Sequence, residues 1–315
     1  MNFDKLHICI IGLHPLKSYD NLYHLVQRIE NFKNFKVSIN IIHDTTDKES
    51  LLLKQKFNES EIGSKINWIQ YESAFLNSGK SFKSRNYASL IMQHEPIEHY
   101  LSLGIPDDDF IFRCRSDYYL TDEFLKMILD KNFYNRLDND EDQIPIFNKK
   151  VWMPYMGTTY FLNCCDYFFV SQAKDQREML ITDDKEARSL WNDSFLNEDR
   201  NFLPAARRGF AERIFFIKPM LNFLRENKIN KLTSNDYWQL VNSNFCYGGD
   251  PSPIKTCFFG WRGSAWQGLG NLGIKHDSHI TKQELERFSK KIEQFSKINS
   301  SKAKNVLLLE DKFKF

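Results

Sequence analysis

Apolar runs of strand length alternate with helix-spaced apolar positions along the first half of the chain. The runs occupy residues 6–12, 35–42, 65–71 and 110–114. Between them, apolar side chains recur at the spacing of one helical face over residues 19–32, 50–57 and 84–103. This order predicts an α/β fold, with a mostly parallel sheet and helices on both faces.

The second half has a less regular pattern. We expect a helix over 122–129, one or two strands over 158–171, and a helix over 209–227 that Pro219 kinks or splits. Residues 248–273 are rich in glycine and aromatic side chains, which predicts irregular structure. A helix with an apolar stripe is expected after Thr281. The prediction is one main domain over 1–245 and an extension over 246–315 that packs on it.

Composition narrows the function classes. The chain has 315 residues and a formal net charge of +2, which gives no indication of nucleic-acid binding through bulk electrostatics. The 6 cysteines show no metal-site spacing and mostly lie in apolar runs, as in reduced intracellular proteins. No signal peptide or run of membrane-spanning length is seen. We expect a cytoplasmic protein.

The most informative stretch is the strand over 110–114 and the residues that follow it. Side chains alternate between the faces of a strand, so Arg113, Arg115 and Asp117 are expected on one face, with Ile111. Charged groups in such a place are costly unless they bind something. Two guanidinium groups and a carboxylate are suited to a phosphate group and a divalent metal, a combination that a sugar-nucleotide transferase needs.

The segment Arg113-Cys114-Arg115-Ser116-Asp117 carries a family resemblance. With it, the chain resembles bacterial cell-surface polysaccharide glycosyltransferases of the WavE type, which have the GT-A nucleotide-diphospho-sugar fold. Weaker matches to the motifs of this family are the stretches 84–90 and 166–169 and the residue Glu212. With them, the resemblance covers roughly residues 6–225. It implies transfer of a sugar from a nucleotide-sugar donor to a growing capsule or lipopolysaccharide acceptor, an oligosaccharide or lipid-linked glycan.

The resemblance also implies a metal. Asp117 would bind Mn²⁺ or Mg²⁺, and a late histidine, His276 or His279, would complete the metal shell. Arg115 stands where an Asp-x-Asp motif has its first acid, so strict metal dependence stays open. The alternatives are that Asp117 caps the next helix or pairs with Arg115, and that the two histidines lie in a surface turn.

Two carboxylates are candidates for the catalytic base that removes a proton from the acceptor hydroxyl. Asp166 lies in an apolar run, where desolvation would raise its pKa, and Glu212 lies on a predicted helix. The alternatives are a strand-end carboxylate for Asp166 and a surface ion pair for Glu212. Arg113 and Arg115 would contact the diphosphate, or would instead pair with Asp117 or Asp166.

The remaining candidates would bind the nucleotide. Gly12 and His14 follow the first strand, where the base should enter, and Asp44 ends the second strand, where it suits ribose hydroxyls. Further donor contacts are assigned to Arg85 and Asn86 at the start of a helix, and to Lys255 and Arg262 in a lid. Alternatively Gly12 only marks a turn, Asp44 caps a helix, and Arg85 belongs to a solvated loop.

Two other functions remain open. One is a phosphoryl- or modified-phosphate transferase that decorates the same polysaccharides, and the other is a glycan-binding assembly protein without activity. The lysines of the last helix, such as Lys290 and Lys291, would suit peripheral attachment to the inner face of the inner membrane. The same apolar stripe would also suit packing on the domain itself.

Overall fold

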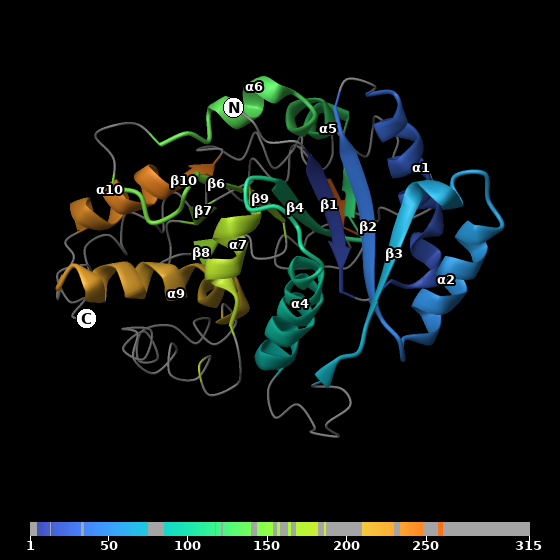
Figure 1. Ribbon diagram of the computed structural model, residues 1–315, viewed down its shortest axis with the longest axis horizontal. Helices are drawn as coiled ribbons and strands as arrows, with labels where there is room; N and C mark the ends of the chain where they lie inside the picture. Colours follow the sequence, from blue (N-terminus) through green and yellow to red (C-terminus); the bar gives the residue numbers. More distant parts are fainter. Residues whose placement is uncertain are drawn as a thin grey trace, which may run out of the picture.

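A seven-stranded sheet forms the centre of the protein (Figure 1). The computed structural model describes residues 5–12, 14–32, 35–74, 85–116, 118–120, 122–139, 144–153, 156–157, 163–164, 168–181, 186, 210–229, 234–247 and 258–260. In spatial order the strands are β10 (Phe245–Tyr247), β6 (Val151–Met153), β9 (Phe169–Gln172), β4 (Phe110–Arg115), β1 (Leu6–Ile11), β2 (Val37–Asp44) and β3 (Ile66–Tyr71).

Most of this sheet is parallel, which confirms the predicted fold class. The four strands β3, β2, β1 and β4 run in one direction, and β10 is parallel to β6. Only β9 is reversed, because it pairs antiparallel with both β4 and β6. Two small antiparallel pairs lie outside the sheet: β5 (Tyr118–Leu120) with β11 (Phe258–Gly260), and β7 (Met156–Gly157) with β8 (Asn163–Cys164).

Helices cover both faces of the sheet, as the pattern of buried positions predicts. They are α1 (Tyr19–Glu30), α2 (Lys48–Asn58), α4 (Arg85–Ser102), α5 (Asp122–Ile128), α6 (Lys131–Asn135), α7 (Ala173–Met179), α9 (Phe210–Glu226) and α10 (Ser234–Asn244), with 3-10 turns η1 (Leu16–Ser18) and η2 (Gly63–Lys65). Alternate residues of β1 contact different helices. Ile8 belongs to the core formed with α1 and α2, whereas Cys9 belongs to the core formed with α4.

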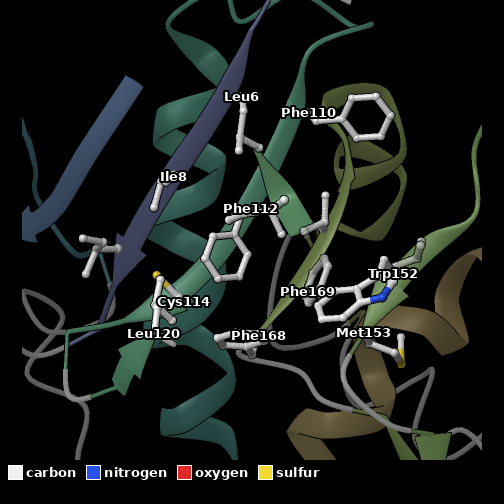
Figure 2. Packing of buried hydrophobic residues seen from close by; sticks show 14 of the residues in the cluster. Leu6, Ile8, Phe110, Phe112, Cys114, Leu120, Trp152, Met153, Phe168 and Phe169 are labelled. Atoms are coloured by element: carbon white, nitrogen blue, oxygen red, sulfur yellow. The ribbon is translucent and has the colours of Figure 1, made fainter. Parts of the chain in front are cut away.

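Aromatic rings pack on one face of the sheet beside the paired strands β4 and β9 (Figure 2). The Phe112 ring lies 5.1 Å from that of Phe124 and 4.9 Å from that of Phe168, measured between centroids. Trp152 of β6 adds a further ring 5.5 Å from Phe124. Tilted and edge-on pairs at these distances are favourable arrangements of aromatic rings. They join the strands on both sides of β9 into one core.

Several expectations for the second half needed revision. The helix predicted over 122–129 is present as α5, but α9 runs through Pro219 without being split. The elements β6, α6, α10 and β10 were not predicted. The proposed domain boundary at residue 245 falls inside β10, so Cys246 and Tyr247 pair within the main sheet. Over the residues that the structure describes, no helix is both long and apolar enough to cross a bilayer.

Candidate functional site

The order in which successive strands join the sheet reverses at β1. From β1 it passes through α1 to β2 and β3, and it then returns through α4 to β4 on the other side of β1. Ligands of open α/β sheets bind beyond the carboxyl ends of the strands at such a reversal. Ile11 pairs with Arg115 at this point, so Gly12 and Ser116 follow the two adjacent strand ends. The sheet therefore brings Gly12 to the segment that leads to position 117.

The segment after β1 has a constrained backbone. Gly12 has a φ of +91°, in the region that residues with a side chain rarely adopt. Beyond it, the buried His14 uses Nε2 to donate a hydrogen bond of 2.9 Å to the carbonyl oxygen of Ile42. His14 thus ties this segment to the end of β2. The predicted contact of Gly12 and His14 with a nucleotide base remains a proposal.

Asp44 at the end of β2 holds the neighbouring turn. One carboxylate oxygen accepts from the backbone N–H of Thr46 at 2.7 Å, and the other accepts from the N–H of Ser73 at 2.7 Å. Asp47, by contrast, caps α2 by accepting from the N–H of Glu49. Burial raises the pKa of Tyr71, and the charge of the nearby Asp44 raises it further, so this phenol stays neutral. Asp44 therefore fixes the ends of β2 and β3 relative to each other.

The two arginines of β4 lie in different environments, although they occupy the same face of the strand. Arg113 is 1% exposed, and its Cζ lies 4.8 Å and 4.5 Å from the ring centroids of Phe169 and Phe215. Its Nη2 donates to the carbonyl oxygen of Gln93 in α4 at 3.1 Å. We therefore assign Arg113 to packing beneath α4 and α9 rather than to a diphosphate. Arg115 is half-buried, with Cζ 5.4 Å from the Tyr118 ring centroid.

Polar residues of α1 contact the segment after β4, and the sequence analysis did not identify them. Asn21 uses Nδ2 to donate to the carbonyl oxygens of both Ser116 and Tyr118, each at 2.9 Å. Ser18 donates through its hydroxyl to the hydroxyl of Ser116 at 3.4 Å. Their positions in the sequence could have indicated this role, because Ser18 and Asn21 lie at and just after the start of the helix that follows the first strand. In this fold that helix begins at the ligand-binding edge of the sheet.

Several predicted site residues lie outside the described residues. These are Asp117, Asp166, Lys255, Arg262, His276 and His279. For three others the structure gives the backbone only: Arg85 and Asn86 begin α4, and Glu212 lies in the first turn of α9. Their assigned roles remain predictions.

The prediction of a metal site can be tested only among the described residues, because Asp117, His276 and His279 lie outside them. Among the described residues, no three His, Cys, Asp or Glu side chains converge in a way that would hold an ion. The described neighbours of position 117 are Arg115, Ser116 and Tyr118, which are a guanidinium and two hydroxyl groups and do not form a carboxylate cage. They do not make a metal site by themselves, and no step of the proposal below is routed through an ion.

Comparisons with known proteins find similar solved structures, including two of the galactosyltransferase LgtC. No protein-family model matches the chain, and no curated protein matches it. The galactosyltransferase LgtC, in complex with donor and acceptor sugar analogues, is similar at 11% identity with a TM-score of 0.43, over 92% of this chain and 95% of that chain. An active-site mutant of LgtC gives 11% identity and a TM-score of 0.37, over 91% and 94% of the two chains. Because these TM-scores are low, we base the functional proposal on the residues of this chain.

Proposed function

We propose that the protein is a glycosyltransferase that uses a nucleotide-sugar donor. The observation that carries this proposal is the reversal at β1, where the ends of β1 and β4 lie side by side. A nucleotide would bind along this edge, with its base near Gly12 and His14. The Arg115-Ser116-Asp117 segment follows β4 at the same edge, and it is the segment that resembles the WavE-type transferases.

The donor's diphosphate is the group that this segment would recognise. Arg115 would donate to the phosphate oxygens, and its position at the last residue of β4 leaves it half-buried, unlike Arg113. Arg85, Asn86, Lys255 and Arg262 are the further candidates for the donor. A divalent ion, where one binds with Asp117, would neutralise charge on the leaving diphosphate.

The acceptor side of the reaction needs a base. Asp166 and Glu212 are our candidates for the carboxylate that takes the proton from the attacking hydroxyl. The acceptor class that we propose, a growing capsule or lipopolysaccharide glycan, rests on the family resemblance. Such an acceptor would place the enzyme in the cytoplasm, with peripheral contact to the inner face of the inner membrane.

A thermal-shift screen tests donor binding directly. UDP-, GDP-, CMP- and dTDP-sugars are added singly, each with and without Mn²⁺. A ligand that binds only the folded protein raises its apparent stability, so one nucleotide should raise the melting temperature. No shift with any donor at millimolar concentration, with or without Mn²⁺, would refute the proposal and favour a glycan-binding protein.

Substitution of Asp117 tests the role of the segment after β4. We expect Asp117→Ala to reduce transfer of the sugar at least about a hundredfold, the scale on which loss of a charge-stabilising group acts. Its melting temperature should stay close to that of the wild type. An Asp117→Ala protein with full activity would contradict the assignment. Product analysis separates the two enzyme classes, because a phosphate transferase would leave phosphate on the polysaccharide and release a different nucleotide.

A further inference from the structure

One side-chain amide of α1 contacts the chain on both sides of position 117. The Nδ2 of Asn21 lies 2.9 Å from the carbonyl oxygen of Ser116 and 2.9 Å from that of Tyr118. A carboxamide has two N–H groups, and these two contacts use both of them. A single nitrogen atom therefore holds the carbonyl groups of the residues before and after position 117.

Ser18, which directly precedes α1, and Arg28 of α1 extend this contact along the same segment. The Ser18 hydroxyl donates to that of Ser116, and Arg28 Nη1 donates to the carbonyl oxygen of Leu120 at 2.6 Å and to the Asp122 carboxylate at 3.0 Å. Positions 18, 21 and 28 are separated by three and seven residues, so they lie on one side of the helix. We call Ser18, Asn21 and Arg28 the α1 clamp.

The clamp joins the two strand ends that flank the candidate site. Helix α1 follows β1 in the chain, whereas residues 116–122 follow β4. Apolar side chains on the adjoining side of α1 anchor the helix, because Leu22, Leu25, Val26 and Ile29 are buried in the core. A helix that is anchored in the core thus carries the donors that hold the residues on both sides of position 117.

We propose that Asn21 is a positioning residue for Asp117. This inference rests on the proposed function, in which the Asp117 carboxylate acts on the donor diphosphate. The side chain of a site residue needs support from surrounding contacts to keep one orientation and so hold the geometry of the site. Asn21 supplies it through the peptide groups on both sides and needs no contact with the substrate.

The test uses Asn21→Leu in the full chain. Leucine has the same branching and a similar size but no N–H group, and it favours helix more than asparagine does, so α1 itself is not weakened. Asn31→Leu is the matched control, because Asn31 lies exposed at the C-terminal end of the same helix. Amide hydrogen exchange of residues 116–120 is measured in the free proteins. We expect these amides to exchange at least about tenfold faster in Asn21→Leu than in the wild type, because a segment that has lost hydrogen bonds opens more easily. In Asn31→Leu their exchange rate should not change.

A double-mutant cycle then connects Asn21 with Asp117. Donor affinity is titrated, with each of the UDP-, GDP-, CMP- and dTDP-sugars, in wild type, Asn21→Leu, Asp117→Ala and the double variant. We expect Asn21→Leu to weaken donor binding about tenfold in the wild-type background and less than about twofold in the Asp117→Ala background.

Each outcome decides one claim. Unchanged exchange at residues 116–120 overturns the positioning role, whatever the donor affinity. Accelerated exchange with an equal loss of affinity in both backgrounds overturns it as well, because Asn21 would then act independently of Asp117. If the wild-type protein binds none of the donors, the proposed function fails and the positioning role fails with it. Accelerated exchange in that case identifies the clamp as a purely structural contact.

Discussion

At the scale of single residues, Arg113 and Arg115 show how far two positions on one strand face can differ. Arg113 lies under α4 and α9, where its guanidinium group faces two phenyl rings. Arg115 ends the strand and is half-buried. A buried cation on aromatic faces stabilises the protein through packing and cation–π contact, whereas we propose that the arginine at the strand end contacts the donor diphosphate.

We predict opposite effects for the two truncations. Arg113→Ala should lower the free energy of unfolding by about 3 kcal/mol or more, because it leaves a cavity the size of a large side chain. Arg115→Ala should cost about 1 kcal/mol or less but weaken donor binding about tenfold. Urea unfolding and nucleotide titration measure the two quantities. An Arg115→Ala protein that binds the donor as tightly as wild type would remove Arg115 from the site.

The sequence could predict the shared face of these arginines but not their different burial. Strand alternation follows from local geometry alone, and it applies equally to both positions. The ring that covers Arg113 from α9, Phe215, lies about a hundred residues later in the chain. Nothing near Arg113 in the sequence indicates that this helix returns to cover it.

At the scale of elements, two glycines that have a positive φ within the described part of the chain offer a matched comparison. Gly12 follows β1 with a φ of +91°, and Gly104 follows α4 with a φ of +83°. At both positions a Cβ atom would meet no heavy atom within 4 Å. Any penalty of a substitution therefore comes from the backbone conformation and not from a clash.

We predict that Gly12→Ala and Gly104→Ala lower stability by a similar amount, about 1–2 kcal/mol each. Only Gly12→Ala should weaken donor binding as well, because Gly12 alone of the two lies at the carboxyl end of β1. Thermal unfolding and donor titration of both variants check this. Equal donor affinity in the two variants would show that Gly12 serves the turn only, which is the alternative left open from the sequence.

Long elements were predictable, and short ones were not. The first four strands and the helices between them carry enough periodic positions for their type to be recognised. Strands of three residues such as β6 and β10 are too short to show an alternating pattern, and their pairing with each other joins positions about a hundred residues apart. Pro219 gave a misleading signal because tertiary packing keeps α9 continuous around it; Phe215, Phe216 and Met220 are all buried there.

At the scale of the whole molecule, three buried histidines link stability to pH. Burial lowers the pKa of His7, His43 and His94, most strongly that of His94, whose ring stacks 4.0 Å from that of Phe215. For His7, burial outweighs the opposing effect of the Asp109 carboxylate 2.9 Å away. His94 Nδ1 accepts from the backbone N–H of Ile181 at 3.3 Å, which requires the unprotonated nitrogen.

The sign of the pH effect follows from these shifts. In the unfolded chain each histidine binds a proton near its ordinary pKa of 6.5, whereas the folded protein resists protonation. Stability is therefore complete above this pH and falls as the pH drops below it. Asp175 acts in the opposite direction between pH 4 and 6, because burial raises its pKa to about 6. Burial also raises the pKa of Glu98, so among the described groups two carboxyl groups oppose the three histidines.

We predict that the free energy of unfolding falls by up to ~1.4 kcal/mol per pH unit for each histidine below its ordinary pKa. His94→Asn retains an acceptor for the Ile181 N–H and cannot be protonated. It should be less stable than wild type at pH 7.5 through loss of the ring contact, yet lose less stability on acidification to about pH 5.5. Urea unfolding at a series of pH values measures both slopes. Parallel curves for the two proteins would exclude His94 as a source of the acid sensitivity.

The last strand of the sheet also has a consequence for shortened forms of the protein. β10 pairs with β6, whose three residues Val151, Trp152 and Met153 are all buried. A chain that stops before Phe245 would leave these apolar residues with unpaired backbone groups, a template for intermolecular strand addition and aggregation. A shortened form prepared by trimming the C-terminus should therefore keep residue 247, and residue 260 as well where the pairing of β11 with β5 is to be retained.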